Sequence, residues 1–476
     1  MEKINKNKSG YKIIEITTES SPFFKAGGLG DACAGISQSL SLKANDVRVF
    51  MPLYSSIREN FKVKRLISFE LDYNNVNIDV SIYALVYRGI THYFFEANDL
   101  FLRKHVYNYT DEPMRFEVFT YVVINALPKL KFKPDIIHYH DWHMGMLPYI
   151  LRTNKEYEYY YKSAKTVLTI HNFGYKGNFN VDEKITYFHF DEYSEEYKDL
   201  VRGKEVSFMR IGIKYSDVVT TVSETYAKEI MQEIRDEKID CNKKIIGITN
   251  GLDFDKFDPE NDAYLYSNFS IDNIETGKMQ NKVFLLKSIG LKNEHNRPLI
   301  IMIARIIKDK GYDLISQICS QLLSENLNFI IMGDGDRDLI NQFMELEENF
   351  SDSFRIFPYE DKLASQLYAA ADIFLMPSHY EPCGTTQMIC MRYGVIPIVR
   401  NTGGLKDTII DFDENPHAGN GFKFYSINKD ELKTRIEEVI KIYENKAKWK
   451  KIINNGYNSV KSWKEVIDNY IDVFIK

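Results

Sequence analysis

The residues best suited to chemistry lie in one short segment, residues 378–387, which reads Ser-His-Tyr-Glu-Pro-Cys-Gly-Thr-Thr-Gln. It follows an apolar run at 373–377 that is typical of a buried strand, and a helix is expected to begin near Thr386. Open α/β sheets bind ligands at the carboxyl ends of their strands. Free N–H groups at a helix start suit phosphate. The carboxylate of Glu381 suits a polyhydroxy group. The segment therefore predicts a ligand that is part phosphate and part sugar.

A glycine-rich turn follows the first expected strand. Lys25 is followed by Gly27 and Gly28, and a helix is expected over residues 32–42. The turn matches neither the dinucleotide fingerprint nor a P-loop. Two adjacent glycines still let the backbone approach a ligand closely, and Lys25 places a cation beside it. A tight turn with a surface lysine is the alternative interpretation.

Three histidines and an acid lie together at residues 138–143, at the end of another expected strand. Such a cluster suggests a metal, but no further acid or cysteine motif completes a ligand set. We therefore expect no metal here, and instead polar side chains that line a cleft, some of them making structural hydrogen bonds. His171 and Asn172 end the next strand, where they are well placed to contact a ligand.

Two cations follow the first strand of the second half of the chain. Arg305 and Lys310 could neutralise a diphosphate and stabilise the charge that develops as it leaves. Lys308 is expected to be solvated. Arg305 directly follows the buried run 300–304, so we expect a buried charge that needs a partner. A second Gly-Gly turn at 403–404 is expected either to pack or to line the nucleotide side.

The elements that position these residues are short apolar runs separated by helical patterns. Such runs suit parallel strands buried on both faces, and two series of them predict an α/β protein with two doubly wound domains. The runs lie at residues 11–16, 47–51, 135–138, 166–170, 218–222 and 245–248, then 299–304, 329–332, 354–357, 373–376 and 395–399. An antiparallel insertion is expected at 78–96. Residues 463–476 form an amphipathic helix that either caps the second domain or crosses back to the first.

Composition narrows the class of protein. The chain has 476 residues, a formal net charge of −6 and five cysteines with no Cys-x-x-Cys spacing. The acidic balance argues against nucleic acid as a partner. The cysteines favour a reducing compartment over a disulfide framework or a zinc site. With a polar N-terminus and no apolar run near the ~20 residues that span a membrane, we expect a cytoplasmic protein with no membrane partner.

Taken together, these segments resemble the bacterial glycogen synthase and plant starch synthase family, retaining glucosyltransferases of the GT-B fold. The resemblance extends across nearly the whole chain. It rests on residues 25–31, 138–146, 169–172, 221–223, 248–253, 305 with 310–311, 376–387, 400–407 and 419–422.

The resemblance implies two Rossmann-like domains facing a deep cleft, with the C-terminal helix crossing back to the first. We expect an acceptor (glucan) domain over residues 1–252, to which 461–476 return, and a nucleotide-sugar domain over 253–460. The implied activity is transfer of glucose from ADP-glucose to the non-reducing end of an α-1,4-glucan primer, with retention of configuration. UDP-glucose stays open as the donor.

The resemblance also implies roles for single residues. Glu381, His171, Arg305 and Lys310 are expected to be catalytic. The residues implied in donor binding are Lys25, Gly27, Gly28, Asp141, Asn250, Tyr359, Cys383, Gly384, Thr385 and Thr386. Tyr359 matches an aromatic residue that stacks on the base. Glu381 positions sugar hydroxyls and is not a nucleophile, in contrast to the two-carboxylate route of retaining glycosidases. The family needs no metal or other cofactor, because fixed cations and a helix start supply positive charge.

Some positions depart from the family pattern. Ala26 replaces Thr, Thr385 replaces Leu, residues 378–380 replace the commoner Ser-Arg-Phe, and residues 42–46 lack the usual Gly-His. None of these departures removes a charged group assigned above, but they leave the donor preference open.

Three other interpretations compete with a glucan synthase. A related transferase that makes sucrose, trehalose or a surface glycan is disfavoured by the residues at 25–29 and 140–143. A catalytically silent glucan-binding protein with a regulatory or scaffolding role is disfavoured by the intact charged residues. A phosphorylase would need a pyridoxal phosphate lysine and a much longer chain.

Overall fold

The computed structural model describes residues 10–73, 75–103, 106–180, 200–237, 239, 241, 243–294 and 297–475. The chain forms two compact units. Unit 1 holds the chain up to Val222, the segment Ala227–Ile248 and the C-terminal residues from Trp463. Unit 2 holds Ser223–Tyr226 and Thr249–Ser462.

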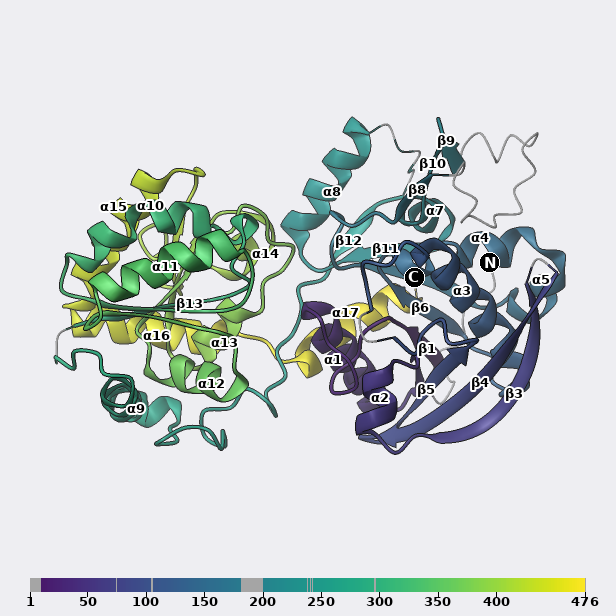
Figure 1. Cartoon of the computed structure of the whole chain (residues 1–476), viewed down its shortest axis with the longest axis horizontal. Helices are drawn as coiled ribbons and strands as arrows, with labels where there is room; N and C mark the ends of the chain where they lie inside the picture. Colours follow the sequence, from purple (N-terminus) through teal and green to yellow (C-terminus); the bar gives the residue numbers. More distant parts are fainter. Residues whose placement is uncertain are drawn as a thin grey trace. The chain divides into compact units, whose positions relative to one another are not determined.

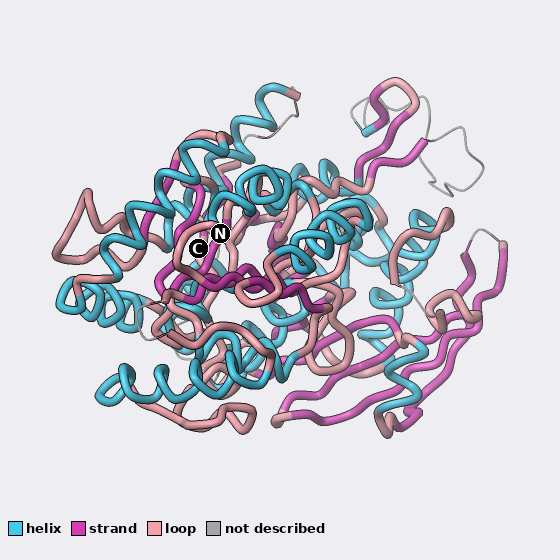
Figure 2. The backbone as a smooth tube through the Cα atoms, turned by 60° about the vertical axis from the view of Figure 1, so that its left-hand side comes forward, coloured by secondary structure: helices cyan, strands magenta, loops and turns pink. Residues whose placement is uncertain are grey.

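Unit 1 is built on a nine-stranded sheet with the order β12-β11-β7-β6-β1-β2-β5-β4-β3. Its strands are β1 Lys12–Ile16, β2 Asp46–Pro52, β3 Lys64–Tyr73, β4 Val76–Tyr87, β5 Ile90–Ala97, β6 Ile136–His140, β7 Lys165–Ile170, β11 Val218–Thr221 and β12 Ile245–Gly247. The strands from β12 to β5 pair in parallel, whereas β3, β4 and β5 pair antiparallel. The long strands β3 and β4 curve along one edge (Figures 1 and 2). The predicted antiparallel insertion is confirmed, although its first strand, β3, lies outside the range 78–96.

The helices of unit 1 connect these strands. They are α1 Gly28–Leu42, α2 Ser55–Asn60, α3 Glu112–Lys129, α4 Leu147–Thr153, α5 Lys155–Tyr161, α7 Phe208–Tyr215, most of α8 Glu224–Asp236, and α17 Trp463–Ile475. A 3₁₀ turn, η1, spans Trp142–Met144, and a small sheet joins β8 Asn178–Asn180, β10 Glu205–Ser207 and β9 Val201–Arg202. Helix α1 begins at Gly28, four residues before the predicted start at Ala32, so both glycines of the turn lie at its N-terminus.

Unit 2 is built on a six-stranded parallel sheet with the order β15-β14-β13-β16-β17-β18. Its strands are β13 Leu299–Ile303, β14 Asn328–Met332, β15 Phe354–Phe357, β16 Ile373–Met376, β17 Ile396–Arg400 and β18 Phe422–Phe424. Its helices are η2 Ile271–Asn273, α9 Ile274–Ser288, η3 Lys308–Lys310, α10 Tyr312–Leu323, α11 Arg337–Asn349, α12 Asp361–Ala370, α13 Thr386–Arg392, α14 Gly403–Thr408, α15 Lys429–Tyr443 and α16 Lys446–Ser459. The predicted pair of Rossmann-like α/β domains is thus confirmed.

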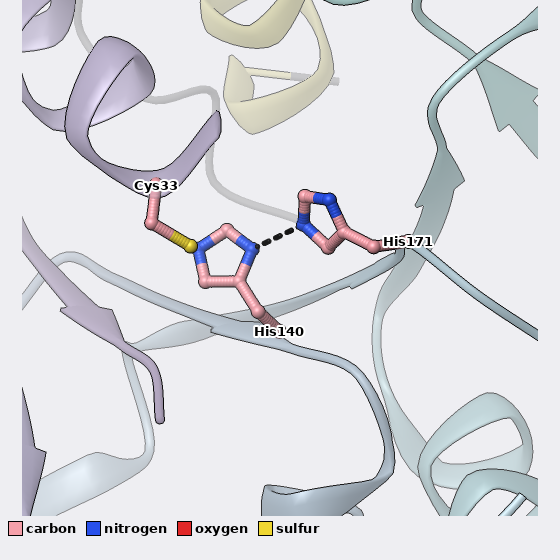
Figure 3. Close-up of side chains that lie close together, drawn as sticks. All are labelled: Cys33, His140 and His171. Atoms are coloured by element: carbon pink, nitrogen blue, oxygen red, sulfur yellow. Dashed lines mark hydrogen bonds between the residues drawn. The ribbon is translucent and has the colours of Figure 1, made fainter. Parts of the chain in front are cut away.

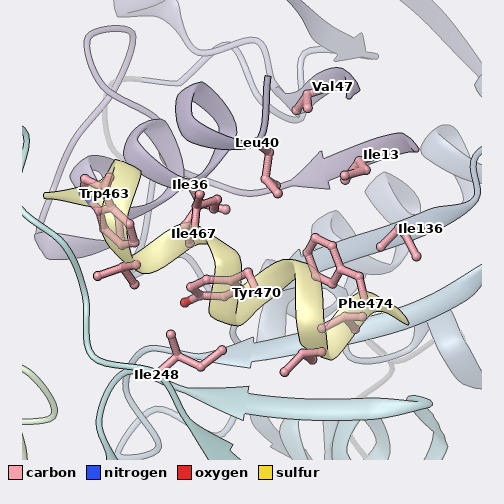
Figure 4. Packing of buried hydrophobic residues seen from close by; sticks show 14 residues of the cluster. Ile13, Ile36, Leu40, Val47, Ile136, Ile248, Trp463, Ile467, Tyr470 and Phe474 are labelled. Carbon is pink, nitrogen blue, oxygen red and sulfur yellow. The ribbon is translucent and has the colours of Figure 1, made fainter. Parts of the chain in front are cut away.

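The C-terminal helix α17 completes the core of unit 1. Its apolar face packs with residues of α1 and of the strands β1, β2, β6 and β7 (Figure 4). Gly35 of α1 makes room for Trp463, since a Cβ atom at position 35 would lie 2.2 Å from Nε1 of the indole. Lys165 Nζ donates to the carbonyls of Val473 and Phe474, at 3.1 and 3.3 Å, and so caps the end of α17. The helix is therefore an integral part of unit 1.

Within the described ranges, none of the helices combines the length and the apolar character needed to cross a bilayer.

Candidate functional site

The carboxyl end of β16 carries a carboxylate paired with an ammonium group. Glu381 is buried, and Lys310 Nζ lies 2.6 Å from its Oε2 atom. Ser378 Oγ donates to the same oxygen at 3.1 Å. With two donors on one oxygen, the Glu381 side chain is held in one position.

Lys310 reaches Glu381 because the loop after β13 lies against the end of β16. Gly311 has φ +80°, a conformation that favours glycine, and a Cβ atom there would lie 2.2 Å from the carbonyl oxygen of Pro377. Two residues after Pro377, the N–H of His379 donates to the carbonyl of Asp309 at 2.8 Å. The two neighbouring strands thus place the ion pair by backbone contacts.

The second Gly-Gly turn packs against the same segment. Gly403 has φ +44°, and a Cβ atom there would lie 2.0 Å from the carbonyl oxygen of Glu381. The N–H of Gly404 donates to that oxygen at 3.0 Å, and its own Cβ position lies 2.3 Å from the carbonyl oxygen of Cys383. Of the two interpretations left open for this turn, the packing one holds.

The turn at residues 383–386 leads into helix α13. Gly384 has φ +71°, and the buried amide of Gln387 donates to its carbonyl at 2.9 Å. Within the part of the chain that the structure describes, nothing accepts a hydrogen bond from the N–H groups of Gly384, Thr385 or Thr386. Helix α13 starts at Thr386, as predicted. The turn is therefore a set of fixed donors.

Asn250 lies beside this turn, because its backbone is hydrogen-bonded to the Cys383 side chain. Its Oδ1 atom is buried and has no hydrogen-bond partner among the described residues. Burial raises the pKa of the Cys383 thiol to about 12, so the thiol is neutral at pH 7. The orphaned oxygen marks a place where a polar ligand would be held.

Two residues of unit 2 for which the sequence predicts a role at the donor lie on the surface of this unit. Arg305 is exposed, so the expectation that it is a buried charge is wrong: the chain leaves the sheet directly after β13 and the side chain reaches solvent. Its guanidinium has no hydrogen-bond or ion-pair partner within the described ranges. Tyr359 is 51% exposed, and its hydroxyl donates to Asp361 at 2.9 Å. Both side chains are accessible to a ligand.

In unit 1, the glycine-rich turn is held by a carboxylate. The N–H groups of Ala26 and Gly27 donate to Oε2 of Glu19 at 2.7 and 3.1 Å, and Lys25 forms an ion pair with Asp31. Gly27 and Gly28 have no atom within 4 Å of their Cβ positions, and neither has a positive φ. Neither internal packing nor backbone conformation therefore requires glycine, which fits the predicted approach to a ligand.

Asp141 joins the ends of β6 and β7. Its Oδ1 accepts hydrogen bonds from the N–H groups of His171 and Asn172, at 2.7 and 3.2 Å. Its φ of +55° is strained for an aspartate, and burial raises its pKa to about 7. The structure thus brings Asp141 and His171 together, as strand-end neighbours.

The histidines of 138–143 have a buried acid between them. Glu15, in the middle of β1, lies 3.0 Å from His138 Nδ1 and 2.9 Å from His140 Nε2. The other nitrogen of His140 lies 3.0 Å from His171 Nε2, and in Figure 3 the sulfur of Cys33 lies on the opposite side of the His140 ring. The sequence showed no further acid or cysteine motif to complete a ligand set, but the fold brings Glu15 and Cys33 beside these histidines.

Two triads could in principle ligate a metal. The donor atoms of Glu15, His138 and His140, and those of Cys33, His140 and His171, lie within 4.8 Å of one another. Yet His140 uses both nitrogens in hydrogen bonds, and burial raises the pKa of the Cys33 thiol well above its ordinary value. A thiol is a poor ligand until it loses its proton. This donor set fits a hydrogen-bond network better than a metal centre.

His143 belongs to the packing of unit 1. Its ring stacks on Trp142 at 4.2 Å between centroids and lies 4.7 Å from Phe116.

Two residues of the site, Glu15 and Glu19, were not predicted from the sequence. For Glu15 the available signal was a carboxylate inside the apolar run of β1, which has to find a buried partner, whereas Glu19 lies beyond that run.

Comparisons with known proteins cover almost the whole chain. A model of the starch synthase catalytic domain matches residues 12–241, and a model of glycosyl transferases group 1 matches residues 287–458. A glycogen synthase of Clostridium beijerinckii is 37% identical over 97% of this chain and 98% of its own length. A glycogen synthase of Clostridioides difficile is 37% identical over 97% of this chain and 99% of its own length.

Solved structures are also similar to this chain over nearly its whole length. The catalytic domain of starch synthase IV from Arabidopsis thaliana, bound to ADP and acarbose, has a TM-score of 0.87 at 29% identity and covers 98% of this chain and 99% of its own. A sucrose-phosphate synthase from Thermosynechococcus elongatus, at 14% identity and a TM-score of 0.62 over 97% of this chain and 98% of its own, shares the fold.

Proposed function

The chain belongs to the glycogen synthase and starch synthase family, and we propose on this premise that it elongates an α-1,4-glucan with ADP-glucose as the donor. It is a glucosyltransferase that uses a nucleotide sugar. The observation that carries the proposal is the Lys310–Glu381 pair beside the N–H groups of residues 384–386, which have no acceptor among the described residues. The preference for ADP-glucose is supported by the ADP bound to the Arabidopsis relative.

We assign the donor to unit 2. The N–H groups of the 384–386 turn would bind the distal phosphate, and Lys310 and Arg305 would neutralise the diphosphate as negative charge builds up on it. Asn250 offers a buried oxygen without a partner among the described residues, which suits a sugar hydroxyl. Tyr359, half exposed at a strand end, would stack on the base.

In this proposal Glu381 orients the glucose. One of its oxygens already takes hydrogen bonds from Lys310 and Ser378, which lowers its nucleophilicity. The bond between glucose and diphosphate breaks, the leaving diphosphate takes the proton of the acceptor hydroxyl, and the new bond forms on the same face. We assign Lys25, Gly27, Gly28, Asp141 and His171 of unit 1 to contacts with the donor. Because lysine, arginine and backbone donors supply the positive charge, the transfer needs no metal.

We also place the protein in the cytoplasm. All five cysteines are free, and four of them are buried, as suits a reducing compartment.

One assay tests the function. Malto-oligosaccharide primer is incubated with ADP-glucose or with UDP-glucose, and the chain length is followed. We expect elongation with ADP-glucose, faster than with UDP-glucose, and loss of most turnover in Glu381→Ala. Elongation with neither donor would support the silent glucan-binding alternative. Near-normal kcat in Glu381→Ala would show that the site is misassigned.

A further inference from the structure

A buried chain of three residues in unit 1 ends at His171. We call Glu15, His140 and His171 the imidazole chain; they come from β1, from the end of β6 and from just after β7. Glu15 and His140 are fully buried, whereas His171 is partly exposed. The contacts run from Glu15 Oε2 to His140 Nε2 at 2.9 Å, and from His140 Nδ1 to His171 Nε2 at 3.0 Å. Figure 3 shows the two rings facing each other through these nitrogens.

The two rings of the imidazole chain and the neighbouring ring of His138 are neutral at pH 7. Burial lowers the pKa of His138, His140 and His171 to about 3. A neutral imidazole carries a single N–H, so each ring donates from one nitrogen and accepts at the other. The hydrogen bonds of one ring therefore dictate those of the next.

Burial raises the pKa of Glu15 and its hydrogen bond with His140 lowers it; in the ionised form this single carboxylate satisfies every contact of the network. Glu15 then accepts from Nδ1–H of His138 and from Nε2–H of His140. The Nε2 of His138 accepts from Thr169 Oγ1 at 2.7 Å, and Thr169 Oγ1 lies 2.6 Å from Thr220 Oγ1. With Nε2–H on His140, its Nδ1 must accept, so His171 must carry its proton on Nε2.

We propose that Glu15, acting through His140, is a positioning residue that fixes His171 as the Nε2–H tautomer and so directs the lone pair of its Nδ1 toward the ligand. No hydrogen bond from the described residues reaches that Nδ1. The consequence for catalysis rests on the proposed function. A lone pair stabilises the positive charge that develops on the sugar in an oxocarbenium-like transition state, whereas an N–H directed there would oppose it.

Two substitutions together, at positions 15 and 169, should reverse the tautomer of His171 while keeping all the histidine rings. Glutamine at position 15 has one acceptor and one donor, so one histidine must face the amide N–H₂. With Thr169→Val in addition, Nε2 of His138 faces an apolar side chain in either tautomer, and a buried N–H without a partner is less tolerated there than an unpaired lone pair. His138 therefore keeps Nδ1–H and takes the amide oxygen, which directs the N–H₂ at His140.

The test follows the tautomers by ¹⁵N shifts of the ring nitrogens in histidine-labelled protein, with His171 assigned by His171→Gln. We expect Nε2–H on His171 in the wild-type protein and in Thr169→Val, and Nδ1–H in the double variant Glu15→Gln/Thr169→Val. If His171 carries Nδ1–H in the wild type, or keeps Nε2–H in a folded double variant, the proposal is wrong.

Kinetics supply the functional readout. Relative to Thr169→Val, the double variant should lose at least about 10-fold in kcat with little change in the KM for the donor, since the effect concerns developing charge. Equal kcat values would refute the catalytic consequence. The ring shifts need no substrate, so a failure of the donor assignment would leave the tautomer result intact and is thereby distinguished from a failure of this inference.

Discussion

The ammonium group of Lys310 lies 2.6 Å from the carboxylate of Glu381, across 71 positions of sequence. The pair joins the loop after β13 to the loop after β16, which are neighbouring strands of the unit 2 sheet. The carboxyl ends of parallel neighbours meet at one edge, so a cation and an anion from distant segments can act on one ligand.

Lys310→Ala should reduce kcat by about 10²-fold or more, because it removes a cation at the group where charge develops. The matched control is Lys308→Ala, two residues away in the same 3₁₀ turn and exposed. Initial rates with ADP-glucose and primer measure both variants. A similar loss in the two would mean that general loop charge, rather than Lys310, matters.

Arg305→Ala should also cost about 10²-fold in kcat, since an exposed guanidinium is free to clamp the diphosphate. Its free energy of unfolding should stay within about 0.5 kcal/mol of wild type, as for surface substitutions. Rates and chemical denaturation are measured on the same preparation. Full activity of Arg305→Ala would show that Arg305 does not contribute to the site.

Gly28→Ala and Gly403→Ala separate two uses of glycine. At Gly28 an added Cβ meets nothing within 4 Å, so stability should be kept or slightly raised, while the donor KM rises if the backbone approaches the ligand there. At Gly403 the Cβ would lie 2.0 Å from the carbonyl oxygen of Glu381 at φ +44°, so the protein should be destabilised and kcat should fall. Thermal melts and kinetics of both variants check this. Unchanged donor KM in Gly28→Ala would contradict the ligand approach.

Glu117→Gln should change how stability depends on pH. Burial raises the pKa of Glu117, which accepts a hydrogen bond from Tyr73, from 4.5 to about 7. The folded protein therefore keeps a proton that the unfolded chain loses, and stability falls as pH rises from about 4.5 to 7. Above pH 7 the variant should be more stable than wild type by about 2–3 kcal/mol, with little difference at pH 4.5.

Urea unfolding across this pH range measures the effect. The control is Glu59→Gln, since Glu59 is exposed on α2. A constant offset between Glu117→Gln and wild type at all pH values would point to packing rather than protonation.

Trp463→Ala should destabilise unit 1 by about 3–5 kcal/mol, as large buried aromatics do when truncated. Trp463 is 6% exposed and fills the space left by Gly35, whereas Ile475 on the same helix is 41% exposed. Ile475→Ala is therefore the matched control and should change little. Denaturant unfolding of both tests whether α17 is part of the core.

The order of residue types was enough to predict the fold class and the places where ligand chemistry is concentrated. Short β-branched runs with helical stretches between them admit little other than parallel sheets buried on both faces, and polar residues at strand ends can only point to one edge. Hence the segments around Glu381, His171 and Lys25 were found without coordinates. Their family resemblance is confirmed by the comparisons, whereas the individual roles stay predictions.

Which side chains meet depends on the complete fold. Sequence cannot show that Glu15, 123 positions before His138, completes a buried network, because the contact depends on the pairing of β1 with β6. Nor could it show that Arg305 reaches solvent two residues after the buried strand β13 ends, or that the glycines at 403–404 serve packing. Such contacts are set by strand order and register, which arise from the whole chain and not from any local pattern.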